Sequence, residues 1–177
     1  MALKATIYKV ELTIADLDRH YYAEHALTIA RHPSETEERM MVRVLAFALH
    51  ADEGLAFGKG LCADDEADVW QFDLTGAIRK WIDVGQPDEK WMRKASARAA
   101  EVVVIAFGRS ADVWWSGVRN KLTRLDNLAV WCLPAEAAPA LAGLVDRGMR
   151  LQVTIQDGQV WVTDGKLTVT VEPRRLM

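Results

Sequence analysis

The stretch DVWQFDLTGAIRKWIDV, residues 68–84, decides how this chain folds. Two runs rich in β-branched and aromatic residues flank the turn dipeptide Thr75-Gly76, a pattern that predicts a β-hairpin. If the turn centres on that dipeptide, facing residues carry numbers that sum to 151. The facing pairs are then Phe72 with Arg79, Trp70 with Trp81, and Asp68 with Asp83.

The pair with the greatest chemical interest is Asp68 and Asp83. Facing residues project to the same side of a hairpin with their Cβ atoms about 5 Å apart. Two carboxylates that close repel each other, so they need a cation, a shared proton or open solvent. A divalent ion would satisfy both, and Mg²⁺ is the default ion for oxygen ligands. A register slip of one residue would separate the pair, and both would then be ordinary loop and strand-end residues.

Two more charged residues are candidates for the same site. Glu38 stands at the start of the apolar stripe of a helix predicted after Ser34, where a carboxylate could face the sheet. Alternatively, a neighbouring arginine or water satisfies Glu38 at the helix start. Lys94 belongs to the basic face of a helix predicted from Pro87, and it could steady a phosphate or a developing oxyanion. Alternatively, Lys94 is a solvated basic side chain.

Outward from the hairpin, hydrophobic periodicity and turn residues predict the other elements. Ser34 with Glu37 forms a capping box that begins the first helix, and Glu35 is expected to pair with Arg39 one turn on. The remaining segments are a hairpin over 5–14 and 20–30, buried strands at 102–105 and 128–133, helices at 111–122 and 135–146, and a three-stranded meander divided by Asp157-Gly158 and Asp164-Gly165.

This order predicts an α/β protein with a mixed sheet flanked by helices. The terminal hairpin and the meander are expected to pair into an additional antiparallel sheet. No linker or repeat divides the chain of 177 residues, so we expect one domain over 1–177.

Composition narrows the function classes. The hydrophobic fraction is 50% and the charged fraction 27%, which excludes a disordered or collagen-like chain. The net charge of −3 argues against a generic nucleic-acid coat, yet residues 79–98 hold six basic and three acidic side chains. No signal peptide or membrane span is visible, and Cys62 and Cys132 form no ligand spacing. We therefore expect a cytoplasmic protein with no membrane contact. Its seven tryptophans are expected to serve mainly in packing.

Several runs of this sequence resemble the YaeQ family of bacterial proteins. The matching runs are Met1-Ala-Leu-Lys-Ala-Thr-Ile-Tyr-Lys9, Leu27-Thr-Ile-Ala-Arg-His-Pro-Ser-Glu35 with Glu38-Arg-Met-Met41, Gly60-Leu-Cys-Ala-Asp-Asp-Glu66, Trp81-Ile-Asp-Val-Gly85 with Pro87-Asp-Glu89, and Thr154-Ile-Gln-Asp-Gly158. The resemblance covers essentially the whole length.

The YaeQ family is similar in fold to the PD-(D/E)XK nucleases, the restriction-endonuclease-like superfamily. The resemblance implies a nuclease-like core over about residues 34–133, in which acidic residues on a hairpin bind metal and activate water. By position, Asp68 and Asp83 take the metal-binding roles and Glu38 joins them. The sequence departs from the superfamily pattern at Gly85, where the lysine of the D/E-x-K motif would stand. Lys94 could supply that lysine from the neighbouring helix.

Three functions follow as expectations. The first is Mg²⁺-dependent hydrolysis of phosphodiester bonds, with Asp68, Asp83, Glu38 and Lys94 as the site. The second is a catalytically inactive protein of nuclease-like fold that binds nucleic acid or the transcription machinery, which the missing lysine favours. The third is a module that binds proteins through exposed sheet edges or tryptophan faces.

Overall fold

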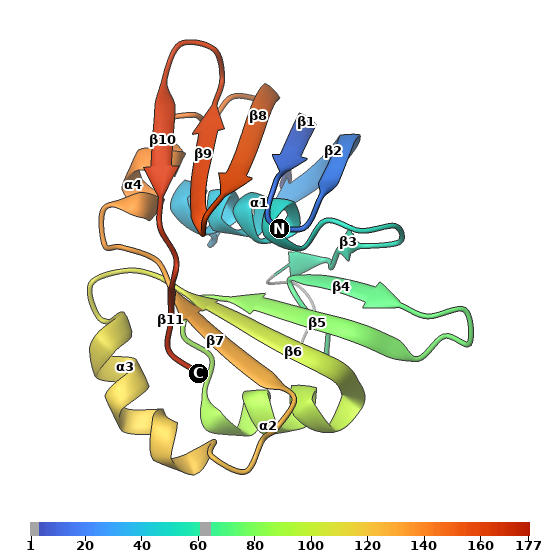
Figure 1. Ribbon diagram of the computed structural model, residues 1–177, viewed down its shortest axis with the longest axis vertical. Helices are drawn as coiled ribbons and strands as arrows, with labels where there is room; N and C mark the ends of the chain where they lie inside the picture. The colour runs from blue at the N-terminus through green and yellow to red at the C-terminus, as the bar shows by residue number, and fades with distance from the viewer. Residues whose placement is uncertain (1–3, 61–64) are drawn as a thin grey trace.

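The computed structural model describes residues 4–60 and 65–177. Two mixed β-sheets and their helices stack in alternating layers (Figure 1). We call the sheet at the top of Figure 1 the upper sheet. Its strands, in spatial order, are β10 (Thr168–Val171), β9 (Gln159–Thr163), β8 (Gly148–Gln156), β1 (Thr6–Asp16) and β2 (Tyr21–Arg31).

The second, lower sheet contains the hairpin predicted from residues 68–84. Its strands, in spatial order, are β11 (Arg174–Arg175), β7 (Leu128–Cys132), β6 (Ala99–Ala106), β5 (Ile78–Val84), β4 (Val69–Phe72) and β3 (Ala56–Phe57). The two central strands, β5 and β6, are neighbours in parallel, and β6 also runs parallel to β7. This explains the continuous apolar run of β6, because a strand covered on both faces needs no polar side.

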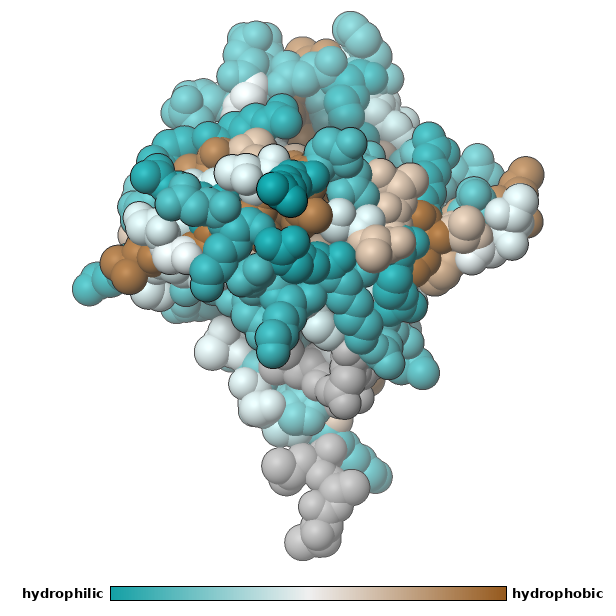
Figure 2. Space-filling model, turned by 90° about the horizontal axis from the view of Figure 1, so that it is seen from below, coloured by the Kyte–Doolittle hydropathy of each residue, from teal (hydrophilic) through white to brown (hydrophobic). Residues whose placement is uncertain are grey.

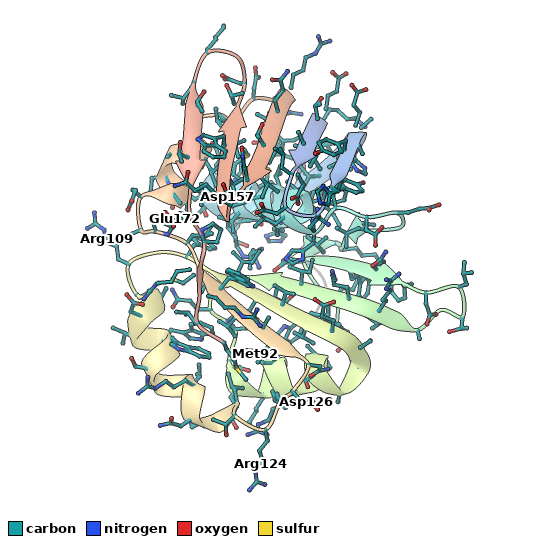
Figure 3. The ribbon with its side chains drawn as sticks, viewed as in Figure 1. Met92, Arg109, Arg124, Asp126, Asp157 and Glu172 are labelled. Atoms are coloured by element: carbon teal, nitrogen blue, oxygen red, sulfur yellow. The ribbon has the colours of Figure 1, made fainter. Side chains whose placement is uncertain are left out.

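The helices form two further layers. Helix α1 (Glu37–His50) lies between the two sheets, and α4 (Ala137–Ala142) packs beside it (Figure 1). The other helices are α2 (Glu89–Arg98), α3 (Ala111–Val118) and the 3₁₀ helix η2 (Arg119–Lys121). They cover the far face of the lower sheet, where Met92 of α2 is fully buried against it (Figure 3). Hydrophilic residues dominate the outer side of this layer (Figure 2).

Two hydrophobic clusters hold these layers together. The larger one joins the inner face of the upper sheet, α1 and the inner face of the lower sheet. The smaller one lies between the lower sheet and the outer helices, and it contains Trp81, Met92 and Val104. One core therefore spans both sheets, and the expectation of one domain over 1–177 stays a prediction.

The mixed α/β class with two sheets flanked by helices is confirmed. The terminal hairpin and the meander do share a sheet, and both Asp-Gly turns lie where they were predicted. One strand pairing differs from the expected antiparallel sheet: β1 and β8 are neighbours that run parallel to each other. The chain reaches β8 from the outer helices and α4 rather than through a hairpin, so no tight turn forces the strands antiparallel.

Several element boundaries were predicted wrongly. Thr36, not Ser34, caps α1, because Thr36 has extended backbone angles and its hydroxyl accepts from the Arg39 N–H. The helix predicted over 111–122 changes to 3₁₀ geometry after Val118, just past Gly117, a poor helix former. The helix predicted over 135–146 is shorter because its C-cap is Gly143. The short strands β3 and β11 carry no sequence signal that was recognised.

Candidate functional site

The predicted proximity of Asp68 and Asp83 is correct. Strands β4 and β5 pair Val69 with Ile82 and Trp70 with Trp81, which extends the expected register to the two aspartates. Asp68 donates its backbone N–H to Asp83 Oδ1 at 3.3 Å. The register shifts only at the other end, where an irregularity beside the turn pairs Phe72 with Ile78 instead of Arg79. Both aspartates are buried.

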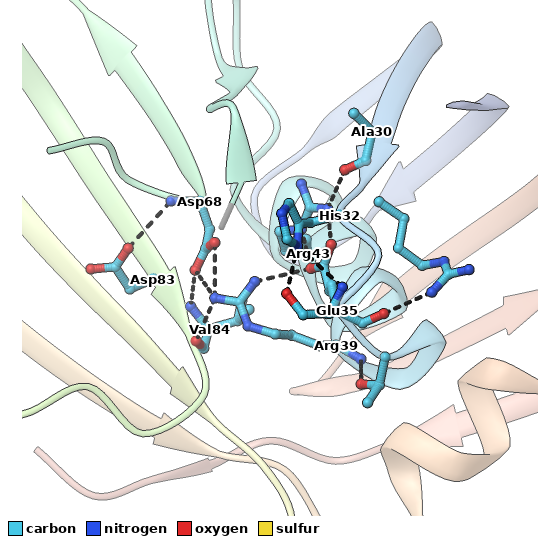
Figure 4. A network of polar contacts seen from close by, with 11 residues as sticks. Ala30, His32, Glu35, Arg39, Arg43, Asp68, Asp83 and Val84 are labelled. Carbon is cyan, nitrogen blue, oxygen red and sulfur yellow. Dashed lines mark hydrogen bonds and ion pairs between the residues drawn. The ribbon is translucent and has the colours of Figure 1, made fainter. Parts of the chain in front are cut away.

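The two carboxylates nevertheless turn to different partners (Figure 4). Both oxygens of Asp68 accept from Arg39 Nη2 of α1, each at 3.0 Å, and Oδ2 also accepts from the Val84 N–H at 2.9 Å. Asp83 Oδ2 accepts instead from the indole N–H groups of Trp81 and Trp91, at 2.7 and 2.6 Å. Asp68 is therefore held toward α1, between the sheets, while Asp83 is held toward α2.

The environment of Asp83 favours its protonated form. Burial, together with the nearby carboxylate of Asp68, raises the pKa of Asp83 to about 6. The two indole bonds and the Asp68 N–H act in the opposite direction, because they stabilise the charged form. None of the three donors carries a positive charge, so the burial cost is only partly offset.

Arg39 belongs to a longer chain of ion pairs that runs into α1. Its Nη1 donates to Glu35 Oε1 at 3.0 Å. Glu35 in turn receives two bonds from Arg43, Nε to Oε1 at 2.8 Å and Nη2 to Oε2 at 2.6 Å. Arg43 is fully buried and also donates to the Ala30 carbonyl at 2.7 Å. Its Nη1 has no hydrogen-bond partner within the described residues. The expected pairing of Glu35 with Arg39 is thus confirmed, and Arg43 adds a third member.

A cavity of about 450 Å³ opens beside Asp68 and Asp83. Two glycines with positive φ, Gly60 at 77° and Gly85 at 100°, line it together with the indole of Trp91. Among the described residues, its charged lining consists of Arg39 and the carboxylates of Glu66, Asp68, Asp83 and Asp88. Asp88 also caps α2 through the Trp91 N–H at 2.8 Å, which fixes the indole where it meets Asp83.

The structure does not bring Glu38 or Lys94 to this cavity wall. Glu38 is partly exposed on the first turn of α1, and the carboxylate that faces inward there is Glu35. Lys94 is exposed on α2, forms an ion pair with Asp65 and lies 5.4 Å from the centre of the Trp91 ring. Their proposed roles in catalysis stay predictions, since no observation here tests an activity.

The donor set in this arrangement does not fit a Mg²⁺ ion shared by Asp68 and Asp83. Each of the four carboxylate oxygens already accepts at least one hydrogen bond. Arg39 Nη2 also lies 3.4 Å from the Val84 carbonyl oxygen, so a protein cation sits among the oxygens that could ligate metal. Across residues 4–60 and 65–177, no group of three or more His, Cys, Asp or Glu side chains could hold a metal ion.

The sequence did not predict the network that Arg39 and Arg43 form with Glu35 and Asp68. Arg39 was expected only as the partner of Glu35, and the neighbouring arginines Arg39 and Arg43 as alternatives that satisfy Glu38. The recognisable signal is that Arg43 interrupts the continuous apolar run from Met40 to Ala48, so a buried helix carries a charge that needs a partner. Trp91, like the other tryptophans, was expected to serve mainly in packing, and its bond to Asp83 depends on how α2 packs on the sheet.

These features define a mixed α/β protein with a buried carboxylate–arginine network beside an open cavity. The sequence identifies the group of proteins to which it belongs: the model of the family described as "YaeQ protein" matches residues 1–173, and the chain is a member of the YaeQ family.

Relatives and solved structures agree with that assignment. The chain is 47% identical over 172 residues to YaeQ of Escherichia coli K12, covering 97% of this chain and 95% of the relative. Identity to YaeQ of Salmonella typhi is 44% over 173 residues, covering 97% and 96%. The crystal structure of YaeQ from Xanthomonas axonopodis pv. citri superposes with a TM-score of 0.95 at 50% identity, covering 98% of each chain. YaeQ from Pseudomonas syringae superposes with a TM-score of 0.94 at 39% identity, covering 98% and 96%.

In the part of the chain that the structure describes, no helix combines the length and the apolar character that a membrane crossing requires.

Proposed function

We propose that this protein binds nucleic acid through a basic face and does not cleave it, as a nuclease-like fold without a working hydrolytic centre. The observation that carries the proposal is a local excess of positive charge. Residues 89–124 hold eight basic and three acidic side chains in a chain whose net charge is −3. The helices of this segment, α2, α3 and η2, form the outer layer on the lower sheet.

The basic face consists of exposed side chains from α2, η2 and the residues just after η2. Its members are Lys90, Arg93, Lys94, Arg98, Arg119, Lys121 and Arg124. Arg93 donates to the Lys121 carbonyl, and Glu89 forms ion pairs with both residues, so α2 and η2 present one continuous surface. Arg124 projects into solvent at the bottom of this layer (Figure 3). Within the described residues, Lys90, Arg119 and Arg124 have no acidic partner.

Such a surface suits a phosphate backbone. Each lysine or arginine that contacts a phosphate releases condensed counterions, and this release supplies most of the affinity in binding that ignores sequence. The contacts that lysine and arginine make to phosphates are of the backbone-positioning kind. We propose the cytoplasm as the location of this binding. We base no proposal on a partner from the transcription machinery, since no observed contact favours one.

The cavity supports binding without cleavage for two reasons. Arg39 neutralises Asp68, which removes the first carboxylate expected to hold a metal ion. Gly85 occupies the place of the motif lysine, and Lys94, its expected replacement, is engaged with Asp65 and Trp91. Both features weaken the parts that would bind a metal ion and activate an attacking water.

Mg²⁺-dependent hydrolysis stays a second candidate because of the cavity's acidic lining. Among the described residues, four carboxylates and one guanidinium line the cavity, and carboxylate oxygens are the ligands that Mg²⁺ prefers. This candidate requires Arg39 to release Asp68 when the metal ion and the nucleic acid bind.

Binding is tested with fluorescently labelled single-stranded and duplex DNA and RNA, titrated with the full chain. The test variant combines Lys90→Glu, Arg119→Glu and Arg124→Glu. Its matched control carries the same charge change around the upper sheet, outside β2, with Lys4→Glu, Arg150→Glu and Lys166→Glu. We expect the test variant to lose most of its affinity and the control to keep it. Equal loss in both variants would show that only net charge matters and would overturn the proposed face.

Cleavage is tested by incubating the same substrates with the protein in Mg²⁺ or Mn²⁺. We expect intact nucleic acid throughout. Cleavage by the wild-type chain that disappears in Asp83→Asn would establish the second candidate instead. Cleavage that persists in Asp83→Asn would come from a contaminant or from another site.

A further inference from the structure

Strand β2 forms an unusually open edge of the upper sheet (Figure 1). It has 11 residues, whereas the other three edge strands, β10, β3 and β11, have 4, 2 and 2. Natural proteins usually blunt an exposed edge with short strands, lysine, proline or a bulge. Strand β2 contains no lysine and no proline, and its pairing with β1 is continuous from Tyr21 to Arg31.

The alternation of hydrogen-bonded and non-hydrogen-bonded pairs between β1 and β2 shows which backbone groups of β2 point away from β1. Lys9 of β1 donates its N–H to the Arg147 carbonyl, on the side away from β2. In an antiparallel pair, the residue facing Lys9 must then also point its backbone groups outward, and that residue is Thr28. By alternation, the outward-pointing residues are Tyr22, Glu24, Ala26, Thr28 and Ala30. The Ala30 carbonyl accepts from Arg43; the other four have no hydrogen bond on this side within the described residues.

We propose that this edge pairs with β2 of a second copy of the chain, forming a two-fold dimer with one continuous sheet across both copies. A two-fold axis through Ala26 places Ala26 opposite itself, Glu24 opposite Thr28, and Tyr22 opposite Ala30. Only this register pairs every outward-pointing residue of the strand with another one. The small Ala26 side chain at the centre allows the two strands to approach closely.

Charge selects the same register. Lys9 Nζ donates to Thr28 Oγ1 at 2.7 Å, so the ammonium lies over the edge strand. In the dimer Thr28 faces Glu24 of the second copy, and facing Cβ atoms lie about 5 Å apart. Lys9 of each copy therefore approaches Glu24 of the other. A register centred on Glu24 would oppose two carboxylates, and one centred on Thr28 would bring two lysines together.

Side chains on the core-facing side of β2 also become more buried in the dimer. Tyr21 and Leu27 pack against the main core but stay only partly buried at the sheet edge. The same register places Leu27 opposite His25 of the second copy. Apolar surface that is partly exposed to solvent in the monomer is therefore buried in the dimer, which favours association.

The test is the oligomeric state of the full chain, measured by sedimentation equilibrium over a range of concentrations. We expect a reversible dimer. Glu24→Lys and Lys9→Glu should each weaken dimerisation about tenfold or more, because two symmetric attractions become repulsions. The double variant with both changes should recover most of the affinity. The control, Lys166→Glu with Glu172→Lys, should dimerise like the wild type.

A backbone variant separates edge pairing from charge alone. Ala26→Pro removes an N–H that points outward, and proline is tolerated at such edge positions. It should yield a folded monomer with an unchanged circular dichroism spectrum. A wild-type chain that stays monomeric at all concentrations would overturn the proposal, as would a dimer that Ala26→Pro and Glu24→Lys leave intact.

Discussion

The guanidinium of Arg39 donates to both carboxylate oxygens of Asp68 at 3.0 Å, and it links that aspartate to Glu35, four residues earlier in the segment just before α1. A side chain on the helix between the two sheets thereby neutralises the carboxylate at the mouth of the hairpin. This contact matters for the cavity, because a protein cation already pairs with one of the two carboxylates expected to bind a metal ion.

Removing Arg39 should lower the free energy of unfolding, because Asp68 would remain buried without its cationic partner. Arg39→Ala leaves a buried carboxylate with only the Val84 N–H as a donor, so we expect a loss of roughly 1–3 kcal/mol in the free energy of unfolding. Urea denaturation followed by tryptophan fluorescence measures this loss. The control Arg79→Ala, an exposed arginine on the same sheet, should change stability by less than about 0.5 kcal/mol. Equal effects would mean that the Arg39 contact contributes nothing specific.

Arg43 should be the most costly arginine to replace. Arg43→Met leaves Glu35 buried without its two-bond partner, and breaking a buried ion pair costs about 3–5 kcal/mol. In that variant Glu35 keeps only its bond from Arg39. The double variant with Glu35→Gln removes this under-compensated charge, so its loss should be smaller than the sum of the single losses by about 1 kcal/mol or more. Strictly additive losses in this double-mutant cycle would contradict the coupling seen in the structure.

Asp83 should make the stability depend on pH in a specific window. Its folded pKa of about 6 lies above the ordinary value of 3.8, so between these values the folded chain binds the proton more tightly than the unfolded chain. The contribution of Asp83 is therefore most favourable below about pH 4, is lost as the pH rises to about 6, and is constant above that, a total of about 3 kcal/mol.

Comparing the wild type with Asp83→Asn isolates this contribution, because the other titrating groups cancel. The stability of Asp83→Asn relative to the wild type should rise between pH 4 and pH 6.5 and then level off. A difference that does not change with pH would show that Asp83 titrates normally in the folded protein.

Trp91 should lower the pKa of the Asp83 carboxyl group through its indole hydrogen bond. Trp91→Phe removes one of the two indole donors to Asp83 Oδ2 while keeping an aromatic ring. Because the charged form loses a hydrogen bond, the pKa of Asp83 should rise further. We expect a loss of roughly 1–3 kcal/mol at pH 7 that becomes smaller at pH 5. Trp115→Phe, on α3, is the control and should show no such pH dependence.

The sequence predicted the local geometry of the hairpin well. Trp70 and Trp81 face each other as a perpendicular pair with ring centres 5.8 Å apart, and the aspartates lie together beyond them. Period-two patterns and turn dipeptides carry this information, because they fix register within a few residues.

What the sequence did not reveal is how the hairpin meets α1. Asp68 precedes the first residue of β4, so the alternation of the strand does not determine where its carboxylate points. Its direction depends on Arg39, which lies 29 positions away and reaches it only after α1 has packed between the sheets. Contacts between separate layers of this kind leave no periodic signal, so the partner of a buried charge had to come from the fold.

The salt dependence of nucleic-acid binding tests the central claim most directly. Affinity for a single-stranded and a duplex probe is measured over a range of salt concentrations for the wild type and for the variant with Lys90→Glu, Arg119→Glu and Arg124→Glu. The account predicts that wild-type affinity falls steeply with salt, without cleavage. In the variant, the slope of log K against log[salt] should be shallower by up to about 3, one unit for each lost phosphate contact. Wild-type binding that is absent, insensitive to salt or unchanged in the variant would contradict it.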